Sequence, residues 1–387
     1  MENVLLVFGG KSYEHDISVV TASQIFNKTC LKEYNLIPFY ISRDNKFYIY
    51  NSKEFNISDF SVSNFICLKK KFKEVALIPN ENKIIFLKTK LGLREYFKTE
   101  TAIMCCHGGN GENGILEAVF ESCGIYSSAG NIDSLAVCMN KYLFKQMMYG
   151  LKIPTVKGFK INEKEYLSNT DEIICKIKKI NFPIVLKPNN GGSSIGLFIV
   201  NNIGELEEKL GYAFEFDSEV LIEKYIPKTR EFNVAVLGDY NDFELSEIDE
   251  PLKENEILTF SDKYCSSRSG KLGKLNNDNK LSMASSFRNF PANISDRIKN
   301  RLYKLTKKIF KSLNLRGVVR IDYLYDEINN KIYVCEVNAI PGSLAYYFFN
   351  NDKLIINEFV IKLIKLAKKY KNSKFCVKNE FITDILN

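Results

Sequence analysis

The sequence lacks several features that would each point to a particular class of protein. No apolar run approaches the roughly 20 residues that a membrane-spanning helix needs. The first residues also lack the basic region and the cleavage site of a signal peptide. The ten cysteines contain no CxxC pair, which argues against a zinc site and a disulfide framework. We therefore expect a cytoplasmic protein without a membrane partner, in which the adjacent Cys105 and Cys106 behave as small hydrophobic side chains.

The composition is that of a globular protein. The chain has 387 residues, of which 45% are hydrophobic and 26% are charged, and this length suffices for two or three domains. The formal net charge is +8, and the lysines are densest between Lys362 and Lys374. A solvated helix face accounts for this group more simply than a nucleic-acid patch does. We expect no nucleic-acid partner, and mild positive charge suits an anionic nucleotide substrate.

The order of apolar runs and helical patterns predicts an α/β protein of three domains. The first domain, 1–139, should contain strands at 4–8, 36–41, 75–77, 84–87 and 102–106, with helices starting near Ser18 and at 115–122. A central domain, 140–225, should contain buried strands at 182–187 and 219–223. The last domain, 226–387, should contain a helix at 294–313 and strands at 317–325 and 331–338. Residues 252–290 are polar and too long for an ordinary connection, so we expect a lid there.

Two glycine-rich turns occur where predicted strands end. The first, GGKSYEHDIS at 9–18, is not a P-loop, because the first glycine of that motif would fall at Leu5. The second is CHGGNGENG at 106–114. The only two histidines, His15 and His107, lie in these turns, and open α/β sheets bind ligands beyond the carboxyl ends of their strands. Each segment is either a ligand-binding turn or simply a tight one.

A third segment, FPIVLKPNNGGSSIG at 182–196, delivers a lysine to the end of an apolar strand. The Gly and Ser residues that follow can fold over a polyphosphate, with donors from backbone and hydroxyl groups. A surface hairpin is the alternative. Lys187 favours the phosphate interpretation, because a lysine at the end of a buried strand needs an anionic partner.

A fourth pattern joins the two late strands. Alternation places Arg320 and Asp322 on one face of the first strand and Glu336 and Asn338 on one face of the second. If the strands are neighbours, three oxygen ligands converge beside a guanidinium, a set that suits Mg²⁺ on nucleotide phosphates. A salt-bridged solvent face is the alternative, although the residues around these positions are apolar.

Taken in order, the four segments resemble the signature of D-alanine:D-alanine ligases, GG-x-S-x-E-H-x-I-S, HG-x-x-G-E-x-G, K-P-x-x-x-GSS-x-G, and R-x-D followed by E-x-N-x-x-PG. The resemblance covers residues 4–349. It implies an α/β, three-domain ATP-grasp fold with an N-terminal parallel-sheet domain. It also implies a homodimer that joins two D-amino acids through an acyl phosphate, most simply to D-alanyl-D-alanine for peptidoglycan. The alternatives are a ligase with a different second substrate and a non-catalytic ATP-binding regulator.

The resemblance also implies which residues hold each ligand. The ATP phosphates and adenosine would contact Lys141, Lys187, Ser194, Glu223, Lys224, Ile226 and Glu231. The metal ligands would be Asp322, Glu336 and Asn338, holding two Mg²⁺ ions, with Mn²⁺ as an alternative. Glu14, supported by Ser193 and Tyr264, would receive the first ammonium, and Arg320 with the backbone of Gly342 would stabilise the oxyanion. His107, Lys263 and Tyr347 would contact the amino-acid substrates.

The sequence departs from the family pattern at three positions that bear on function. Asn113 stands where an acidic residue is usual, and Asn140 replaces the Asp that commonly precedes the phosphate-binding lysine. Tyr347 falls where these ligases usually place a serine that contacts the carboxylate of the second substrate. We therefore expect the pocket for the second substrate to be reshaped.

Overall fold

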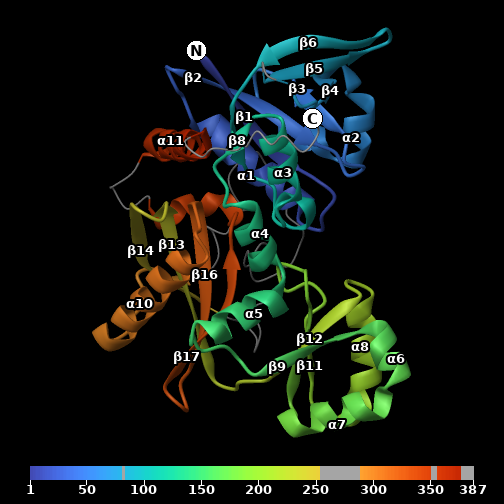
Figure 1. Ribbon diagram of the computed structural model, residues 1–387, viewed down its shortest axis with the longest axis vertical. Helices are drawn as coiled ribbons and strands as arrows, with labels where there is room; N and C mark the ends of the chain where they lie inside the picture. The colour runs from blue at the N-terminus through green and yellow to red at the C-terminus, as the bar shows by residue number, and fades with distance from the viewer. Residues whose placement is uncertain (81–82, 253–287, 350–354, 376–387) are drawn as a thin grey trace, which may run out of the picture.

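The computed structural model of the protein describes residues 1–80, 83–252, 288–349 and 355–375, which form three sheets with helices packed around them (Figure 1). The predicted α/β class is confirmed. Nearly all of the predicted lid, together with Lys263 and Tyr264, lies outside the described residues. None of the helices in the described ranges is long and apolar enough to cross a membrane.

The first sheet has eight strands in the order β6-β5-β4-β3-β2-β1-β7-β8. They are β1 (Glu2–Gly9), β2 (Tyr34–Ile41), β3 (Phe47–Tyr50), β4 (Phe72–Ala76), β5 (Ile84–Thr89), β6 (Gly92–Lys98), β7 (Thr101–Met104) and β8 (Tyr126–Ser127). Strand β1 is parallel to β2 and β7, and its residues 4–8 are fully buried, which explains their uninterrupted apolar run. The expected parallel sheet thus forms only half of this sheet, because β3 to β6 are added in antiparallel pairs.

Helices cover this first sheet and connect its parallel strands. Helix α1 (His15–Lys28) follows β1 and starts earlier than the predicted Ser18, while α3 (Ile115–Ser122) has the predicted bounds. Helix α11 (Ile356–Phe375) contains the lysine-rich segment and packs on β7 and β8. The basic segment is therefore a helix with one buried face, which includes Phe359, Leu363 and Ala367.

The second sheet is smaller and has its own hydrophobic core. Its order is β11-β10-β12-β9, with β9 (Gly158–Asn162), β10 (Ile184–Pro188), β11 (Phe198–Val200) and β12 (Glu219–Lys224) all antiparallel. Helices α5 (Lys141–Gly150), α6 (Glu163–Ser168), α7 (Thr170–Ile180) and α8 (Leu206–Phe214) accompany it. Ile173 and Ile177 of α7 lie four residues apart and are both buried, so one face of this helix closes the core.

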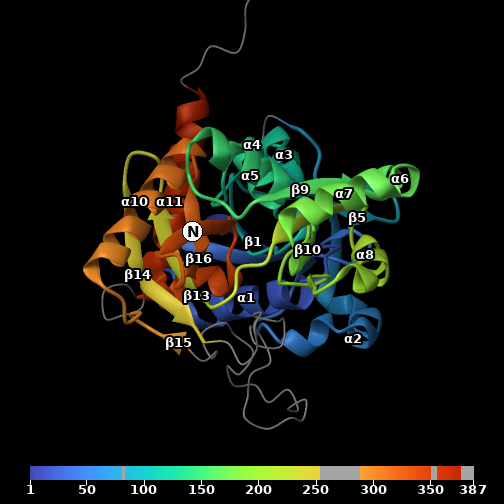
Figure 2. The same ribbon diagram turned by 90° about the horizontal axis from the view of Figure 1, so that it is seen from below.

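The third sheet has the order β15-β14-β13-β16-β17. Its strands are β13 (Thr229–Gly238), β14 (Phe243–Pro251), β15 (Arg288–Asn289), β16 (Gly317–Asp326) and β17 (Lys331–Asn338). Helix α10 (Asp296–Ser312) packs against it and buries Leu302, Ile309 and Phe310. Figure 2 shows this sheet beside the second one, an arrangement that leaves a cavity between them.

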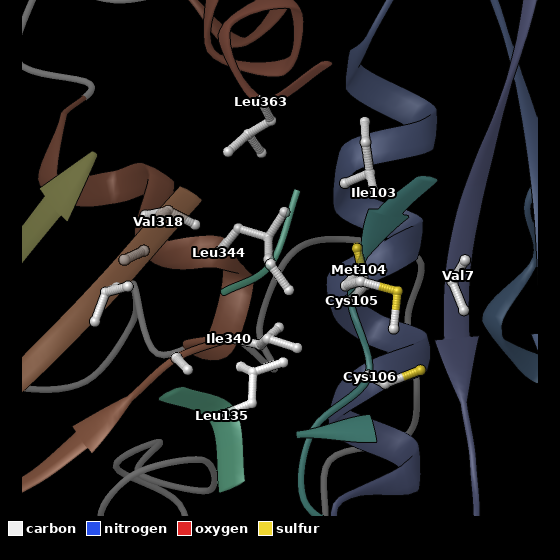
Figure 3. Packing of buried hydrophobic residues seen from close by; sticks show 14 of the residues in the cluster. Val7, Ile103, Met104, Cys105, Cys106, Leu135, Val318, Ile340, Leu344 and Leu363 are labelled. Carbon is white, nitrogen blue, oxygen red and sulfur yellow. The ribbon is translucent and has the colours of Figure 1, made fainter. Parts of the chain in front are cut away.

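The first and third sheets share one core. Figure 3 shows Leu344 and Ile340, which follow β17, beside Met104 and Cys105 at the end of β7. Cys105 and Cys106 are fully buried, and burial raises the pKa of Cys106 to about 12, so both thiols act as apolar side chains as predicted. A shared core fixes the turn after β17 against the first sheet.

A glycine marks a close approach between these two sheets. Gly317 begins β16 with φ near +85°, and a Cβ at this position would lie 1.9 Å from the carbonyl oxygen of Ser128. Only glycine combines this backbone conformation with so short a distance. The described strands of the three sheets span 2–127, 158–224 and 229–338, while the domain boundaries near 139 and 225 stay predictions.

Candidate functional site

The cavity between the second and third sheets collects residues from all of the later sequence motifs. Its lining includes ten of the predicted site residues: Lys141, Lys187, Ser194, Glu223, Lys224, Ile226, Glu231, Arg320, Asp322 and Glu336. Among the lining residues to which the sequence assigned no role, four have charged or amide side chains: Lys145, Asn233, Asp249 and Arg288. The structure thus brings the third and fourth motifs together, and the role of each side chain stays a prediction.

Two lysines share one carboxylate at the floor of this cavity. Lys187 on β10 lies 2.6 Å from Oε2 of Glu223 on the neighbouring β12, and Lys145 of α5 lies 2.5 Å from Oε1. Burial opposes ionisation of Glu223, but the charges of Lys187 and Lys145 outweigh it and lower its pKa to about 2. Glu223 therefore stays ionised. The anionic partner that Lys187 requires is present in the protein itself.

Lys145 is held by a second acceptor, because its Nζ also donates to the carbonyl oxygen of Val156 at 2.6 Å. It lies one helical turn after Lys141, on the same face of α5. The predicted phosphate ligand and this unassigned lysine therefore enter the cavity together. Asn140 caps the same helix by accepting from the N–H of Leu143 at 2.9 Å, a role that an Asp would fill equally well.

Glu14 sits where the two glycine-rich turns and the third motif meet. Its Oε1 accepts a hydrogen bond from the hydroxyl of Ser193. A Cβ added to Gly108 or to Gly192 would lie 2.6 Å from Oε2 of Glu14, so both backbones approach this carboxylate as only glycine allows. The predicted pairing of Glu14 with Ser193 is present, and it joins α1 to the loop after β10.

Arg320 and Asp322 form a bidentate ion pair on β16. Nε and Nη2 of Arg320 donate to the two oxygens of Asp322, each at 2.7 Å, and Nδ2 of Asn338 donates to the same carboxylate at 2.9 Å. The register of β16 and β17 places Asp322 opposite Glu336 and Arg320 opposite Asn338. The predicted shared face is therefore confirmed, and Arg320 is 5% exposed.

The donors of this cluster are two carboxylates and one amide. Among the described residues no group of three or more His, Cys, Asp and Glu side chains could hold a metal ion. Hard-oxygen ligands that leave several positions for water and phosphate are nevertheless the kind of set that Mg²⁺ takes beside a nucleotide. Asp322, Glu336 and Asn338 fit that requirement chemically.

His107 and Glu112 contact the turn that follows β17. Nδ1 of His107 is 2.8 Å from the carbonyl oxygen of Ile340, and its Nε2 is 2.9 Å from the hydroxyl of Thr21. Burial lowers the pKa of His107 to about 4, so the ring is neutral. Glu112 accepts from the N–H of Gly108 at 3.0 Å and of Ile340 at 3.3 Å. Burial is the largest cause that raises the pKa of Glu112 to about 7, and the negative charge of Glu14 is the second.

Gly342 is buried within this turn, at the start of the kinked segment Gly342–Phe348. Near its end, the ring of Tyr347 lies 4.5 Å from the guanidinium of Arg288, which in turn is 3.5 Å from Oδ1 of Asp249. Burial raises the pKa of Tyr347 above its ordinary value. Arg288 lines the cavity, so the ring of Tyr347 contacts a residue of the cavity wall.

Comparisons with known proteins agree over most of the chain. The profiles described as D-ala D-ala ligase N-terminus and C-terminus match residues 3–128 and 147–352. The D-alanine–D-alanine ligase of Thermosipho melanesiensis is 33% identical over 377 residues, which cover 97% of this chain and 96% of that protein. Among solved structures, the VanG D-Ala:D-Ser ligase from Enterococcus faecalis superposes with a TM-score of 0.77 at 25% identity, covering 95% of this chain and 99% of that one. The D-alanine–D-alanine ligase from Helicobacter pylori gives a TM-score of 0.71 at 28% identity, covering 95% and 98%.

Proposed function

The chain belongs to the D-alanine–D-alanine ligase family, and from this premise we propose that it joins two D-alanine molecules with ATP to supply D-alanyl-D-alanine for peptidoglycan. The family has the ATP-grasp fold, and its members are ADP-forming carbon–nitrogen ligases, the enzyme class of this chain. The observation that carries the proposal is the cavity between the second and third sheets, which unites Lys141, Lys187, Arg320, Asp322 and Glu336.

The nucleotide would lie along this cavity. Lys141, Lys187 and Ser194 would contact its phosphates, while Glu223, Lys224, the backbone of Ile226 and Glu231 would contact its adenosine. Asp322, Glu336 and Asn338 would hold Mg²⁺, as two ions, or Mn²⁺ in its place. When bound, the metal supplies positive charge that neutralises the phosphate oxygens. The two lysines that pair with Glu223 support the proposal of an anionic ligand, because a phosphate can replace Glu223 as the partner of Lys187.

The first half-reaction activates a carboxylate that is itself a poor acyl donor. An oxygen of the first D-alanine attacks the γ-phosphorus of ATP, the bond to the bridging β–γ oxygen breaks, and ADP leaves. The product is an acyl phosphate. Glu14, supported by Ser193, would bind the ammonium of this substrate, because a buried carboxylate beside a hydroxyl offers it charge and hydrogen bonds. The roles of Tyr264, as a second support for Glu14, and of Lys263, as a contact of the amino-acid substrates, stay predictions, because both residues lie outside the described ranges.

The second half-reaction forms the peptide bond. The amine of the second D-alanine, after losing a proton, attacks the carbonyl carbon, and the tetrahedral intermediate places negative charge on the former carbonyl oxygen. Arg320 and the N–H of Gly342 would stabilise this oxyanion. The carbon–oxygen bond to the phosphate then breaks, and inorganic phosphate leaves. The bidentate pair with Asp322 supports this role because it fixes the guanidinium in one orientation.

The contact between Tyr347 and Arg288 favours one alternative, a ligase that joins D-alanine to a different second substrate. Tyr347 replaces the usual serine and packs against Arg288, so the wall of the pocket differs chemically from the family pattern. One similar solved structure is that of a D-Ala:D-Ser ligase. We propose in addition that the enzyme is a homodimer, as the resemblance implies, and that it is cytoplasmic, as the sequence pattern led us to expect. A non-catalytic regulator is disfavoured, because such a protein has no need of the full set of metal ligands.

The test is turnover by the purified protein. With ATP, Mg²⁺ and D-alanine, we expect equimolar ADP and phosphate, and a dipeptide identified by mass. Pairing D-alanine with D-serine and larger D-amino acids will identify the second substrate. L-Alanine alone serves as the stereochemical control. Nucleotide binding without turnover for any D- or L-amino acid would contradict the proposal and favour the regulator.

A further inference from the structure

Three side chains from the first part of the chain hold the turn that carries Gly342. We call Thr21, His107 and Glu112 the clamp. Glu112 accepts the N–H of Ile340 at 3.3 Å, and His107 lies 2.8 Å from the carbonyl oxygen of the same residue. Both backbone polar groups of Ile340 are therefore fixed by side chains that lie more than 200 positions earlier in the sequence.

The direction of each hydrogen bond in the clamp follows from its chemistry. A carbonyl oxygen only accepts, so Nδ1 of His107 carries the proton and donates to Ile340. Nε2 of the neutral ring is then an acceptor, and the hydroxyl of Thr21 donates to it at 2.9 Å. The oxygen of Thr21 in turn accepts the N–H of Ser343 at 3.1 Å. Thr21 is 1% exposed and His107 is 3% exposed, so water does not compete for these bonds.

Gly342 lies between the two residues that the clamp holds. On its far side, Ser343, Leu344 and Ala345 have φ between +46° and +53°, a conformation that non-glycine residues rarely adopt and that is strained for them. Such a run persists only where its surroundings determine it. Hydrogen bonds on both sides of Gly342, together with the buried side chains of Leu344 and Ala345, provide that constraint.

Helix α1 carries part of both sites. Glu14 immediately precedes the helix and Thr21 lies two turns later, so seven residues, or about 10 Å of rigid helix, separate them. The resemblance implies that His107 contacts a substrate, yet here both of its ring nitrogens are engaged by protein groups. We propose that Thr21, His107 and Glu112 are positioning residues that place the N–H of Gly342 at a fixed distance from the first substrate's ammonium site. This inference rests on the proposed function.

The two half-reactions separate a positioning role from a purely structural one. If the clamp only positions the donor to the oxyanion, disrupting it should lower the rate of peptide-bond formation and leave the rate of acyl-phosphate formation unchanged. Reversible acyl-phosphate formation is measured by scrambling of ¹⁸O between the bridging and non-bridging positions of labelled ATP in the presence of D-alanine. Peptide-bond formation is measured as dipeptide release by the same preparation.

The matched variants are Thr21→Val, which keeps the shape but removes the hydroxyl, and Thr21→Ser, which keeps the hydroxyl. We expect Thr21→Val to lower kcat for dipeptide release by about 100-fold, the loss that a misplacement of about 1 Å can cause and the lower end of the loss for a missing oxyanion donor. Isotope scrambling and KM for ATP should stay within about twofold. Thr21→Ser should restore dipeptide release to within about threefold of the wild-type rate.

Each outcome decides the matter. Equal losses in scrambling and in dipeptide release, or no loss in either, would overturn the positioning role. If Thr21→Val does not fold, Glu112→Gln tests the other arm of the clamp with the same expectation, because its amide NH₂ would face a backbone N–H. Wild-type protein that neither scrambles the label nor releases dipeptide would overturn the proposed function, and with it this inference, before any variant is compared.

Discussion

Replacing Asp322 by Asn tests how strongly the ion pair on β16 supports both the fold and the reaction. The substitution keeps the shape of the side chain and removes its charge. Arg320 is 5% exposed, and it donates to Asp322 through two bonds of 2.7 Å. In Asp322→Asn one of these donors faces an amide NH₂ group, and a buried guanidinium loses its bidentate carboxylate.

The magnitude follows from these contacts. Hydrogen bonds to charged groups contribute about 1.5 to 3 kcal/mol each, and breaking a buried pair by removing one partner costs about 3 to 5 kcal/mol. We therefore expect the free energy of unfolding to fall by about 3 to 5 kcal/mol. Turnover should fall by at least about 10³-fold, because a ligand of the proposed metal and the orientation of Arg320 are lost together.

The assay combines urea denaturation, followed by circular dichroism, with phosphate release from ATP and D-alanine. The double variant Arg320→Met/Asp322→Asn is the matched control, because removing both partners leaves no unpaired charge. We expect it to be more stable than Asp322→Asn alone and equally inactive. A wild-type denaturation midpoint for Asp322→Asn, or turnover within tenfold of wild type, would refute this reasoning.

Three further predictions concern other parts of the molecule. The pKa of Glu223 is lowered to about 2 from 4.5, so its stabilising charge is fully present above pH 4.5 and is lost as the pH falls toward 2. The difference in the free energy of unfolding between wild type and Glu223→Gln, measured in urea, should therefore narrow by about 3 kcal/mol over that range, and a constant difference would contradict the pairing. Tyr347→Ser removes the ring beside Arg288 and should change KM for the second amino acid about tenfold. If the variant and the wild type both form only D-alanyl-D-alanine with the same KM, Tyr347 does not shape the pocket. Gly317→Ala should lower the free energy of unfolding by about 3 kcal/mol, because its Cβ would meet the carbonyl of Ser128 at a positive φ; wild-type thermal stability would exclude this close approach.

The parts of the fold that could be predicted from the sequence are those with uniform burial. Strand β1 is apolar because both of its faces are covered, and its apolar run is visible without a structure. Strand β14 was not predictable, because its acidic residues suggest a solvent-exposed segment. In the structure these carboxylates are paired across elements, Glu250 with Arg230 and Glu247 with Lys299. Sequence patterns do not record a partner that lies elsewhere in the chain.

The same limit applies to the site. Motifs predicted Lys187 and Asp322 because each lies at a strand end or on a strand face with a readable period. Arg288 could not be predicted, since only the pairing of β15 with β14 brings it to the cavity. Lys145 could have been predicted from its spacing alone, because it lies four residues after Lys141 on the same helix. Glu112 belongs to the second motif, but its contact with Ile340 depends on the register of two distant segments.

The carboxylate shared by Lys145 and Lys187 gives the proposed nucleotide site a counter-ion of its own. If Lys187 binds phosphate as proposed, nucleotide binding is an exchange of ion pairs, in which Lys187 leaves Glu223 for a phosphate while Lys145 keeps Glu223 ionised. The affinity for nucleotide reflects the difference between two ion pairs and not the whole attraction between a lysine and a phosphate. In such a site neither ammonium group is left without an opposite charge when the nucleotide departs, which avoids the cost of an unpaired charge in a largely buried place.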